Sequence, residues 1–297
     1  MSTVSRTSSL SRTGSVMRPD LHLRGTPGRH GPTSPTLDST VLVTGGSSGI
    51  GAELARELAS RSYNVVLAAR RRDRLDALAE ELRVAHGVHA DAEPCDLTDA
   101  GERTELVARL QAGEREVVGV CNNAGFGTIA RFVTSDLERE QQVVRLNVEA
   151  VHHLTGGFLP RMVAQGTGAI LNVASTAVYQ PLPGYATYAA SKAFVQSFSE
   201  AVHAEPGGSG VSVTCLSPGF THTEFGAVAG AAEPERAMPE FLFMEAPVVA
   251  RLGIDAMVAG RRTAIPGLGN RASMLGGRVA PRSLVLPIVR QVTGRRS

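Results

Sequence analysis

The chain has 297 residues, 42% hydrophobic and 20% charged, so it can bury a core and is neither disordered nor fibrous. Its 30 lysines and arginines against 28 acidic residues leave a formal net charge of +2, which argues against a nucleic-acid-binding surface. The three cysteines, Cys95, Cys121 and Cys215, lack paired metal-ligand spacing, so we expect no disulfide framework, no metal site and a cytoplasmic location.

The first 37 residues differ in composition from the rest of the chain. They contain seven Ser, six Thr, five Arg, four Pro and four Gly, with Asp20 as the sole acidic residue. Such a segment cannot build a core, so residues 1–37 are predicted to be a disordered N-terminal extension. An Arg-rich, Ser-rich and acid-poor start also matches an organellar transit peptide, and Met17 offers a later start codon.

From Thr40 onward, short β-rich apolar runs alternate with helical patterns, which indicates parallel βαβ units. The predicted strands cover residues 41–44, 65–69, 88–92, 117–121, 169–174 and 211–216. The predicted helices cover residues 50–60, 72–86, 99–112, 137–165 and 185–204. The predicted fold of residues 38–297 is therefore α/β, a single-domain Rossmann-type doubly wound parallel sheet with helices on both faces.

The longest stretch without a charged side chain runs from Met162 to Ser191. Polar residues and prolines interrupt it, whereas a bilayer span needs about 20 predominantly apolar residues. No integral membrane segment is predicted, and the uncharged but polar composition suits the lining of a small-molecule cleft.

A glycine-rich loop follows the first predicted strand and leads into a helix. Its glycines Gly45, Gly49 and Gly51 let the backbone approach a pyrophosphate, and the helix N-terminus offers free N–H groups to it. Glycine-rich turns also occur as plain tight turns. The loop residues expected to bind a dinucleotide are Gly45, Ser47, Ser48, Gly49, Ile50 and Gly51.

Arginines end the second predicted strand, where NAD-binding folds place an acid on the ribose 2′-hydroxyl. Arg70 and Arg71 cannot accept a hydrogen bond from that hydroxyl, but the donors of a guanidinium suit a 2′-phosphate. The sequence therefore predicts NADP rather than NAD as the cofactor. Arg72 is interpreted as the start of a solvated helix.

Tyr188 and Lys192 are four residues apart on a predicted helix, so their side chains lie on one face within a turn. A nearby ammonium favours the phenolate of a tyrosine by ~4 kcal/mol at 4 Å and an effective dielectric of about 20. That effect brings the phenol toward working pH as an acid or base. A Tyr-x-x-x-Lys pattern alone is ordinary and usually a surface pair.

Lysine usage singles out this pair. Lys192 is the only lysine in the chain, since the other 29 basic residues are arginines, and a guanidinium cannot replace a compact ammonium with three donors. Ser175 ends a predicted strand thirteen residues before Tyr188, where its hydroxyl can hold a substrate oxygen. Asn147, taken by itself, is interpreted as a helix irregularity.

Taken together, the motifs resemble the short-chain dehydrogenase/reductase family over about residues 40–225. They are the glycine loop, Asp96-Leu97, Asn122-Asn123-Ala124-Gly125, Asn147, Ser175, Tyr188-Ala189-Ala190-Ser191-Lys192 and Pro218-Gly219. Ala68-Ala69-Arg70-Arg71, Pro266-Gly267 and Asn270-Arg271 further resemble an NADP-linked branch of this family with poorly defined substrates.

The resemblance implies roles for individual residues. Asn147, Ser175, Tyr188 and Lys192, called the tetrad below, would be catalytic, with Asn147 holding a water that links Lys192 to solvent. Asp96 and Leu97 would flank the adenine, and Thr223 would reach the nicotinamide amide. Asn122 to Gly125 would line the cofactor cleft, and the further cofactor-binding residues implied are Asn123, Ala124, Gly125, Tyr188, Lys192, Pro218 and Gly219.

Aromatic residues gather on loops expected beyond the strand ends, where ligands of open α/β sheets bind. They are Phe126, Tyr179, Tyr185, Phe220, Phe225, Phe241 and Phe243, and they suit a hydrophobic substrate together with Met238, Leu242 and Met244. Residues 241–244 fit core packing equally well. Residues 226–297, with amphipathic helices at 248–259 and 281–292, are expected to form a substrate lid, an oligomer interface or a surface for anionic membranes.

The sequence thus predicts an NADP-dependent oxidoreductase that interconverts an alcohol and a ketone or aldehyde, acting on an apolar small molecule. A homodimer or homotetramer without a nucleic-acid partner is expected. The alternatives are a non-catalytic NADP(H)-binding regulatory protein, an enzyme of the same family that reduces a C=C bond, and a sugar epimerase. The length of the chain disfavours the epimerase.

Overall fold

The computed structural model describes residues 39–229, 243–267 and 269–271, and the single residues Met274, Ser283, Leu286 and Pro287. Seven strands form one sheet in the order β3-β2-β1-β4-β5-β6-β7, and every neighbouring pair is parallel. The strands are β1 (Thr40–Thr44), β2 (Asn64–Ala69), β3 (Ala90–Pro94), β4 (Val117–Asn122), β5 (Gly168–Val173), β6 (Val211–Leu216) and β7 (Thr263–Ala264). The predicted doubly wound parallel fold is confirmed.

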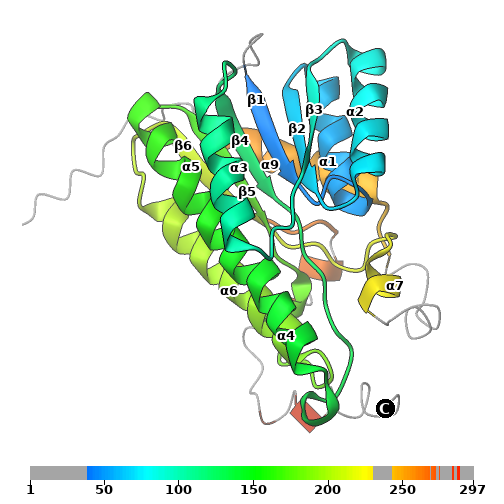
Figure 1. Cartoon of the computed structure of the whole chain (residues 1–297). Helices are drawn as coiled ribbons and strands as arrows, with labels where there is room; N and C mark the ends of the chain where they lie inside the picture. The colour runs from blue at the N-terminus through cyan, green and yellow to red at the C-terminus, as the bar shows by residue number, and fades with distance from the viewer. Residues whose placement is uncertain are drawn as a thin grey trace, which may run out of the picture.

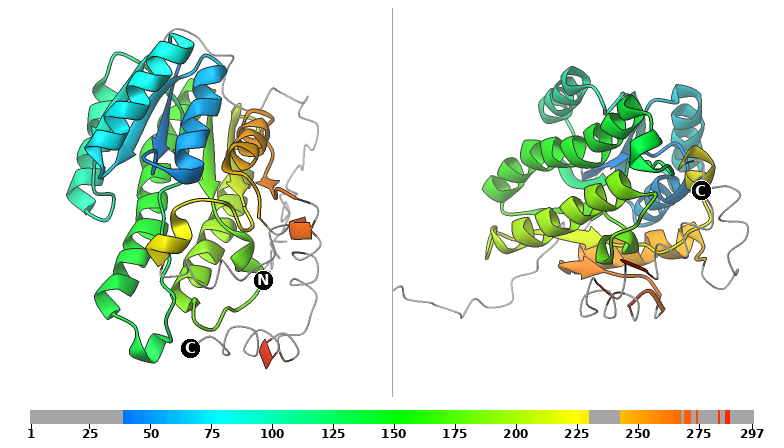
Figure 2. Two further views of the ribbon diagram at one scale, coloured as in Figure 1. Left: turned by 90° about the vertical axis from the view of Figure 1, so that its right-hand side faces the viewer. Right: turned by 90° about the horizontal axis from the view of Figure 1, so that it is seen from below.

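Helices cover both faces of this sheet (Figures 1 and 2). The α-helices are α1 (Gly49–Ser60), α2 (Arg72–His86), α3 (Ala100–Ala112), α4 (Leu137–Val144), α5 (Val151–Gln165), α6 (Ala186–Ala204), α7 (Phe225–Ala229) and α9 (Ala246–Val258). A π-helical turn (Arg145–Ala150) joins α4 to α5, and two 3₁₀ turns cover Phe132–Thr134 and Thr176–Tyr179.

Alternating residues of the central strands build two cores. Val41 and Val43 of β1 point into the core beneath α1, α2 and α9, whereas Leu42 points into the core beneath α3, α5 and α6. All three side chains are fully buried. A strand buried on both faces requires a near-continuous apolar run, which is why the sequence pattern located these strands.

Three elements differ from their predictions. The third strand spans residues 90–94 rather than 88–92, because its register on β2 begins with Val65 beside Ala90. The single helix predicted for residues 137–165 is interrupted by the π-helical turn that holds Asn147. A two-residue strand, β7, pairs with Cys215 and Leu216 where no strand was expected.

Within the region predicted as a lid, residues 226–297, the structure describes helix α9 over its full length. Helix α9 is part of the layer that covers the sheet, since it lies beside α1 and its Val249, Ile254 and Met257 are buried in the core. Its seven buried residues make it a structural helix rather than a movable cover. Residues 1–37 and nearly all of the second helix expected at 281–292 lie outside the described residues.

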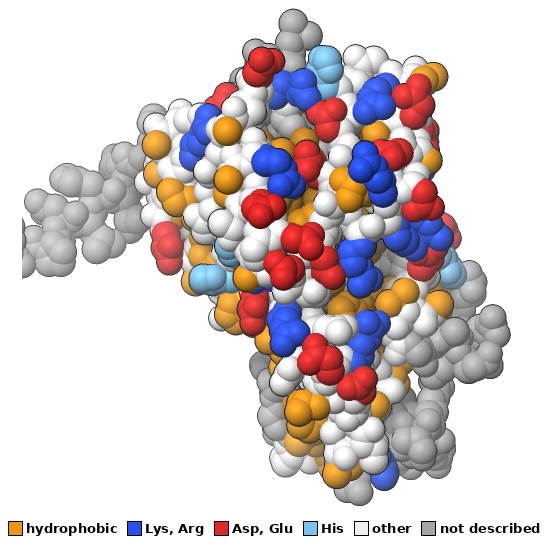
Figure 3. Space-filling model, viewed as in Figure 1, with side chains coloured by type: hydrophobic (Ala, Val, Ile, Leu, Met, Phe, Trp, Pro, Cys, Tyr) orange, Lys and Arg blue, Asp and Glu red, His pale blue; other side chains and the backbone are white. Residues whose placement is uncertain are grey.

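The surface carries mixed charge. Basic and acidic side chains alternate over the coloured part of the face in Figure 3, in keeping with the formal net charge of +2. Within the ranges that the structure describes, no helix combines the length and the apolarity that a bilayer crossing requires.

Candidate active site

The glycine loop takes the shape expected of a phosphate-binding turn. Gly45 and Gly49 have φ angles of 68° and 56°, a region that glycine occupies without strain. A Cβ on Gly51 would lie 2.2 Å from the carbonyl oxygen of Gly45, so glycine is needed there for close packing. Helix α1 begins at Gly49, and the side chain of Ser48 makes no capping bond to its first turn. The helix N-terminus therefore faces the cleft as an anion site.

Hydrogen bonds tie this loop to the end of β4. The Thr44 hydroxyl accepts bonds from the backbone N–H groups of Asn123 and Ala124, both at 3.0 Å, and donates to the Cys121 carbonyl at 3.3 Å. The Asn123 amide donates to the Thr44 carbonyl at 3.0 Å. Two loops that lie far apart in sequence are thereby fixed as neighbouring walls of one cleft.

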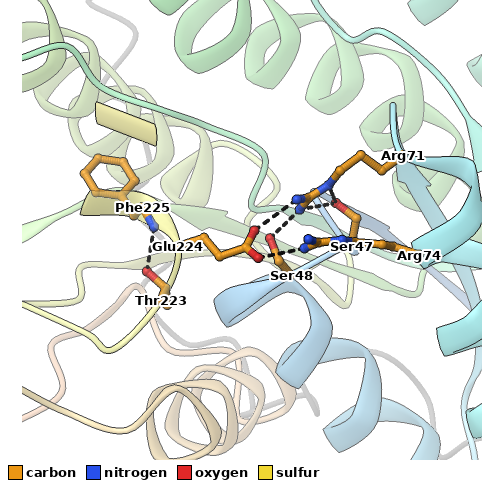
Figure 4. A network of polar contacts seen from close by, with 7 residues as sticks. All are labelled: Ser47, Ser48, Arg71, Arg74, Thr223, Glu224 and Phe225. Carbon is orange, nitrogen blue, oxygen red and sulfur yellow. Dashed lines mark hydrogen bonds and ion pairs between the residues drawn. The ribbon is translucent and has the colours of Figure 1, made fainter. Parts of the chain in front are cut away.

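Arg71 lies where the sequence placed a 2′-phosphate-binding residue. Its Nη2 donates to the hydroxyls of Ser47 at 2.9 Å and Ser48 at 2.7 Å, and its Nε donates to Ser47 at 3.2 Å (Figure 4). Arg70 lines the same cleft. The exposed Arg72 pairs with Asp76 at 3.5 Å, in agreement with its interpretation as the start of a solvated helix.

Asp96 and Leu97 follow β3 and line the same end of the cleft. Asp96 is held in a turn, because its Oδ1 accepts bonds from the backbone N–H and the hydroxyl of Thr98, at 2.9 and 2.8 Å. Leu97 is buried, and its carbonyl accepts a bond of 2.7 Å from Arg103. An apolar side chain beside a fixed carboxylate can accommodate a purine ring and its exocyclic amine.

Lys192 is buried on α6 with only 5% of its surface exposed. Its Nζ donates to the carbonyl of Val173 at 2.8 Å, and burial lowers its pKa to about 8. A Cβ on Gly125 would lie 3.2 Å from this Nζ, so the glycine leaves room for the ammonium. A desolvated ammonium with donors to spare is suited to bind hydroxyl oxygens of a ligand in the cleft.

Asn147 lies in the π-helical turn directly behind Lys192 and is fully buried. Its Oδ1 accepts a bond from the Phe126 N–H at 3.2 Å, while its Nδ2 donates to the Phe126 carbonyl and the Ser191 hydroxyl, both at 3.0 Å. A Cβ on Gly125 would lie 2.9 Å from the same Oδ1. Asn147 is thus both a helix irregularity and a support of the loop that contacts Lys192.

Ser175 and Tyr188 come from different elements and line the same cleft as Lys192. Ser175 follows β5, and its hydroxyl accepts a bond of 3.1 Å from the Ala177 N–H. Tyr188 lies one turn before Lys192 on α6, and its ring centroid is 5.3 Å from that of Phe225. The structure therefore brings together three members of the tetrad at the cleft wall, with Asn147 behind them.

The cleft that joins these groups has a volume of about 2150 Å³. This exceeds the ~300–1,000 Å³ of a drug-sized pocket and leaves room for a dinucleotide and a substrate. Nearly all the predicted cofactor-binding residues line it. They are Gly45, Ser47, Ser48, Gly49, Ile50, Arg70, Arg71, Asp96, Leu97, Asn123, Ala124, Gly125, Tyr188, Lys192, Pro218, Gly219 and Thr223.

Two motif residues lie elsewhere. Gly51 packs against Gly45 behind the loop rather than facing the cleft. Asn122 is buried within the sheet, where its amide donates to Asn172 Oδ1 at 2.8 Å and to the Thr155 hydroxyl at 3.2 Å. Their contribution is therefore to packing, and Asn123, Ala124 and Gly125 form the wall.

The far end of the cleft is aromatic. Phe126, Tyr179, Tyr185, Phe220 and Phe225 line it, as the sequence predicted. A cation is present there too, since the Arg139 guanidinium lies 4.0 Å above the Phe126 ring, and Arg139 lines the cleft. This end offers apolar surface and positive charge, since Arg131 lines the cleft as well.

Of the remaining residues predicted to line the substrate pocket, some pack at the surface and others are not described. Phe243 packs on Phe220 and on His222, with centroid distances of 5.6 and 4.7 Å. The side chain of His222 is 40% exposed, and its Nε2 lies 3.8 Å from Glu245 Oε1. This position indicates a surface role for His222 rather than a catalytic one. Met238, Phe241 and Leu242 lie outside the described residues.

The cysteines are buried small side chains. Burial raises the pKa of Cys121 and Cys215 to about 12 and that of Cys95 to about 11, so all three are unreactive thiols at neutral pH. Among the described residues, no group of three or more His, Cys, Asp or Glu side chains could hold a metal ion.

The structure adds two residues that the sequence analysis did not single out. Arg74, one turn after Arg71 on α2, and Glu224, between β6 and α7, form an ion pair of 2.7 Å at the edge of the cleft. Glu224 also pairs with Arg71 at 3.0 Å (Figure 4). The signal for Arg74 was its helical spacing from Arg71; no pattern near Glu224 pointed to a partner about 150 residues earlier.

Similar proteins share this arrangement of elements. A sulfoacetaldehyde reductase from Chromohalobacter salexigens is 37% identical over 191 residues, 64% of this chain and 75% of the relative. A Sphingobium yanoikuyae short-chain dehydrogenase in complex with NADPH superposes with a TM-score of 0.72 and 34% identity, covering 87% of this chain and 96% of the other. A bulky-bulky ketone specific alcohol dehydrogenase from Comamonas testosteroni has a TM-score of 0.69 and 29% identity, covering 87% and 94%.

The family model for short chain dehydrogenase matches residues 39–234, two thirds of the chain and the whole region from β1 to just beyond α7. This match includes the glycine loop, all four members of the tetrad and the turn after β6. The chain therefore belongs to the short-chain dehydrogenase/reductase family, whose members are oxidoreductases.

Proposed function

We propose that the chain is an NADP-dependent oxidoreductase that interconverts an alcohol with a ketone or aldehyde. The observation that carries the proposal is a single cleft in which Ser175, Tyr188 and the buried Lys192 lie beyond a glycine loop flanked by Arg71. The donor set of Arg71, Ser47 and Ser48 fits a 2′-phosphate. The NADPH complex of the Sphingobium yanoikuyae relative supports the same cofactor.

Each member of the tetrad has a role in this proposal. When bound, NADP supplies or accepts the hydride. Tyr188 donates a proton to the substrate oxygen during reduction and removes one during oxidation, while the Ser175 hydroxyl orients that oxygen. The Lys192 ammonium favours the ionised form of Tyr188 and binds ribose hydroxyls. Asn147 supports the loop at Phe126 and holds a water on the path from Lys192 to solvent.

The aromatic end of the cleft supports an apolar ketone as substrate, and the Comamonas testosteroni relative that acts on bulky ketones agrees with it. Arg139 favours a second candidate, a carbonyl compound with an anionic group. The sulfoacetaldehyde reductase of Chromohalobacter salexigens carries its substrate class in its name. The cytoplasmic location and the assembly as a homodimer or homotetramer stay predictions. Light scattering after size-exclusion chromatography would measure the oligomeric state.

The test measures dissociation constants for NADPH and NADH, then NADPH oxidation with apolar ketones, anionic aldehydes and enones. We expect tighter binding of NADPH and turnover with a ketone or aldehyde. Turnover with enones alone would favour C=C reduction, and binding without turnover of any substrate would favour a regulatory protein.

Tyr188→Phe is the matched variant, because it removes one hydroxyl and keeps the ring that contacts Phe225. It should bind NADPH as the wild type does and lose about 10³-fold in kcat. Unchanged kcat in Tyr188→Phe rules out Tyr188 as the acid.

A further inference from the structure

Three consecutive residues between β6 and α7 cross the cleft. Thr223 packs on the glycine loop, since a Cβ on Gly49 would lie 3.1 Å from the Thr223 side chain. Glu224 reaches Arg71, at the start of α2, and Arg74 of α2 (Figure 4). The ring of Phe225 contacts that of Tyr188. Residues 223–225 therefore connect the cofactor loop, the arginines and the tetrad.

The carboxylate of Glu224 bridges two cations. Its Oε2 lies 3.0 Å from Arg71 Nη1 and its Oε1 lies 2.7 Å from Arg74 Nη1. Hydrogen bonds from Arg74 and Arg71 lower the pKa of Glu224 to about 2, so the carboxylate is ionised at any working pH. Arg71, Arg74 and Glu224, together with Ser47 and Ser48, are called the arginine network below.

The carboxylate of Glu224 lies beside the predicted binding site of the cofactor's 2′-phosphate. The Arg71 guanidinium bonds the Ser47 and Ser48 hydroxyls of the glycine loop, so it lies between that loop and the end of β2. Dinucleotide-binding folds hold the 2′ position of the adenosine ribose in this corner. Glu224 thus neutralises the cation that a 2′-phosphate would need.

We propose that Glu224 is a specificity-determining residue: in the free protein its carboxylate occupies the 2′-phosphate site of the arginine network, and NADP binds by exchanging its phosphate for that carboxylate. The inference rests on the proposed use of NADP. It adds that the cofactor must displace a group of this chain before Arg71 can bind the phosphate.

Competition for donors favours the exchange. Arg71 donates through Nε and Nη2 to the serine hydroxyls and through Nη1 to Glu224, which uses four of the five N–H groups of the guanidinium. While the carboxylate stays in place, a phosphate therefore finds one N–H of Nη1 instead of two. A phosphate dianion beside a retained carboxylate would also be repelled. The ribose of NADH instead carries a hydroxyl, which can donate to Glu224 and leave both ion pairs intact. Glu224 therefore lowers the affinity for NADPH relative to NADH.

The first experiment measures dissociation constants of NADPH and NADH by titration calorimetry for the wild type and Glu224→Gln. Exposed ion pairs contribute up to about 1 kcal/mol, so we expect NADPH to bind about two- to fivefold more tightly to the variant. NADH binding should change less than twofold. Glu105→Gln on α3 makes the same charge change at an exposed pair with Arg109 and should alter neither constant.

Amide hydrogen exchange in residues 223–229 gives a second readout that needs no nicotinamide. The Phe225 N–H is bonded to the Thr223 hydroxyl and the Val228 N–H to the Glu224 carbonyl, so these amides report on the segment. Adding 2′,5′-ADP to the wild type should speed their exchange, whereas 5′-ADP should not. In Glu224→Gln the exchange should be fast without any ligand.

The outcomes separate this inference from the proposed function. If the wild type binds NADPH but Glu224→Gln binds it equally or more weakly, the exchange is wrong and NADP use stands. An equal gain for NADPH and NADH also overturns it, since the effect would then be independent of the phosphate. A wild type that binds neither cofactor overturns both.

Discussion

The tetrad and the arginine network lie in one cleft and are stabilised in opposite ways. Lys192 is almost fully buried, and Asn147 behind it makes three hydrogen bonds that involve backbone groups or a buried hydroxyl. Arg71, Arg74 and Glu224 have side chains 41–47% exposed and are joined by ion pairs. Buried hydrogen bonds are costly to break, whereas exposed ion pairs contribute little.

This difference indicates which part of the cleft is already ordered before a cofactor binds. Without its partners, a buried ammonium or amide would be left unsatisfied, so Lys192 and Asn147 are held in one arrangement. The arginine network can change partners when a stronger anion arrives. The residues for chemistry and those for cofactor selection thus lie in regions of different rigidity, so substitutions in the buried region should have larger effects than those in the exposed one.

The largest effect is expected from Lys192. Lys192→Met removes the ammonium, and kcat should fall by about 10³-fold, as for other acid–base groups. Lys192→Arg keeps the charge but not the compact shape, and should restore little of the loss. The measurement is kcat and KM for both variants with NADPH saturating. Wild-type kcat in Lys192→Arg would show that any cation suffices.

The same substitution should raise stability. Burial lowers the pKa of Lys192 from 10.5 to about 8, so the charged form carries a cost in the folded state at pH 7. Lys192→Met removes this cost but leaves the Val173 carbonyl without its donor. The net free energy of unfolding of the variant at pH 7 should therefore exceed that of the wild type by about 1–2 kcal/mol. Between pH 8 and 10.5 the wild type regains this difference, because its folded state releases the proton and the unfolded state retains it. Urea unfolding at pH 7 and 10 measures both values.

In the arginine network, Arg71→Ala removes the donors nearest the proposed phosphate site. Loss of charge-assisted hydrogen bonds of about 1.5–3 kcal/mol predicts NADPH binding about 10- to 100-fold weaker. NADH binding should change little, and Arg72→Ala, next in sequence and on the surface, serves as the control. Equal losses for both cofactors would show that Arg71 supports the loop rather than the phosphate.

The sequence predicts the tetrad because its signals are local. Tyr188 and Lys192 are one helical turn apart, and Ser175 follows a strand that an apolar run identifies. An irregularity at Asn147 was predicted, but its form as a π-helical turn was not, because the bonds of the Asn147 side chain to the backbone of Phe126 join residues 21 positions apart. Strand β7 likewise depends on its pairing with Cys215 and Leu216, since two residues carry no periodicity.

Only the part of the arginine network with a local sequence signal was predicted. Arg70 and Arg71 stand at the end of a recognisable strand, so their relation to the ribose followed from the fold. Glu224 meets Arg71 across 153 residues of sequence, through a connection with no pattern of its own. Side-chain contacts between loops are set by tertiary packing, and one acidic residue between Thr223 and Phe225 carries no such information in a single sequence.

The smallest predicted effect is that of salt on Glu224→Gln. Exposed pairs are screened as the Debye length falls from about 10 Å at 0.1 M to about 3 Å at 1 M ionic strength. Salt therefore weakens the ion pairs of Glu224 in the wild type. Glu224→Gln has no such ion pairs for salt to weaken. The gain in NADPH affinity on Glu224→Gln, measured by calorimetry, should shrink to less than twofold at 1 M NaCl. A gain that persists at high salt would locate the effect of Glu224 in packing of residues 223–225 rather than in competition for the guanidinium of Arg71.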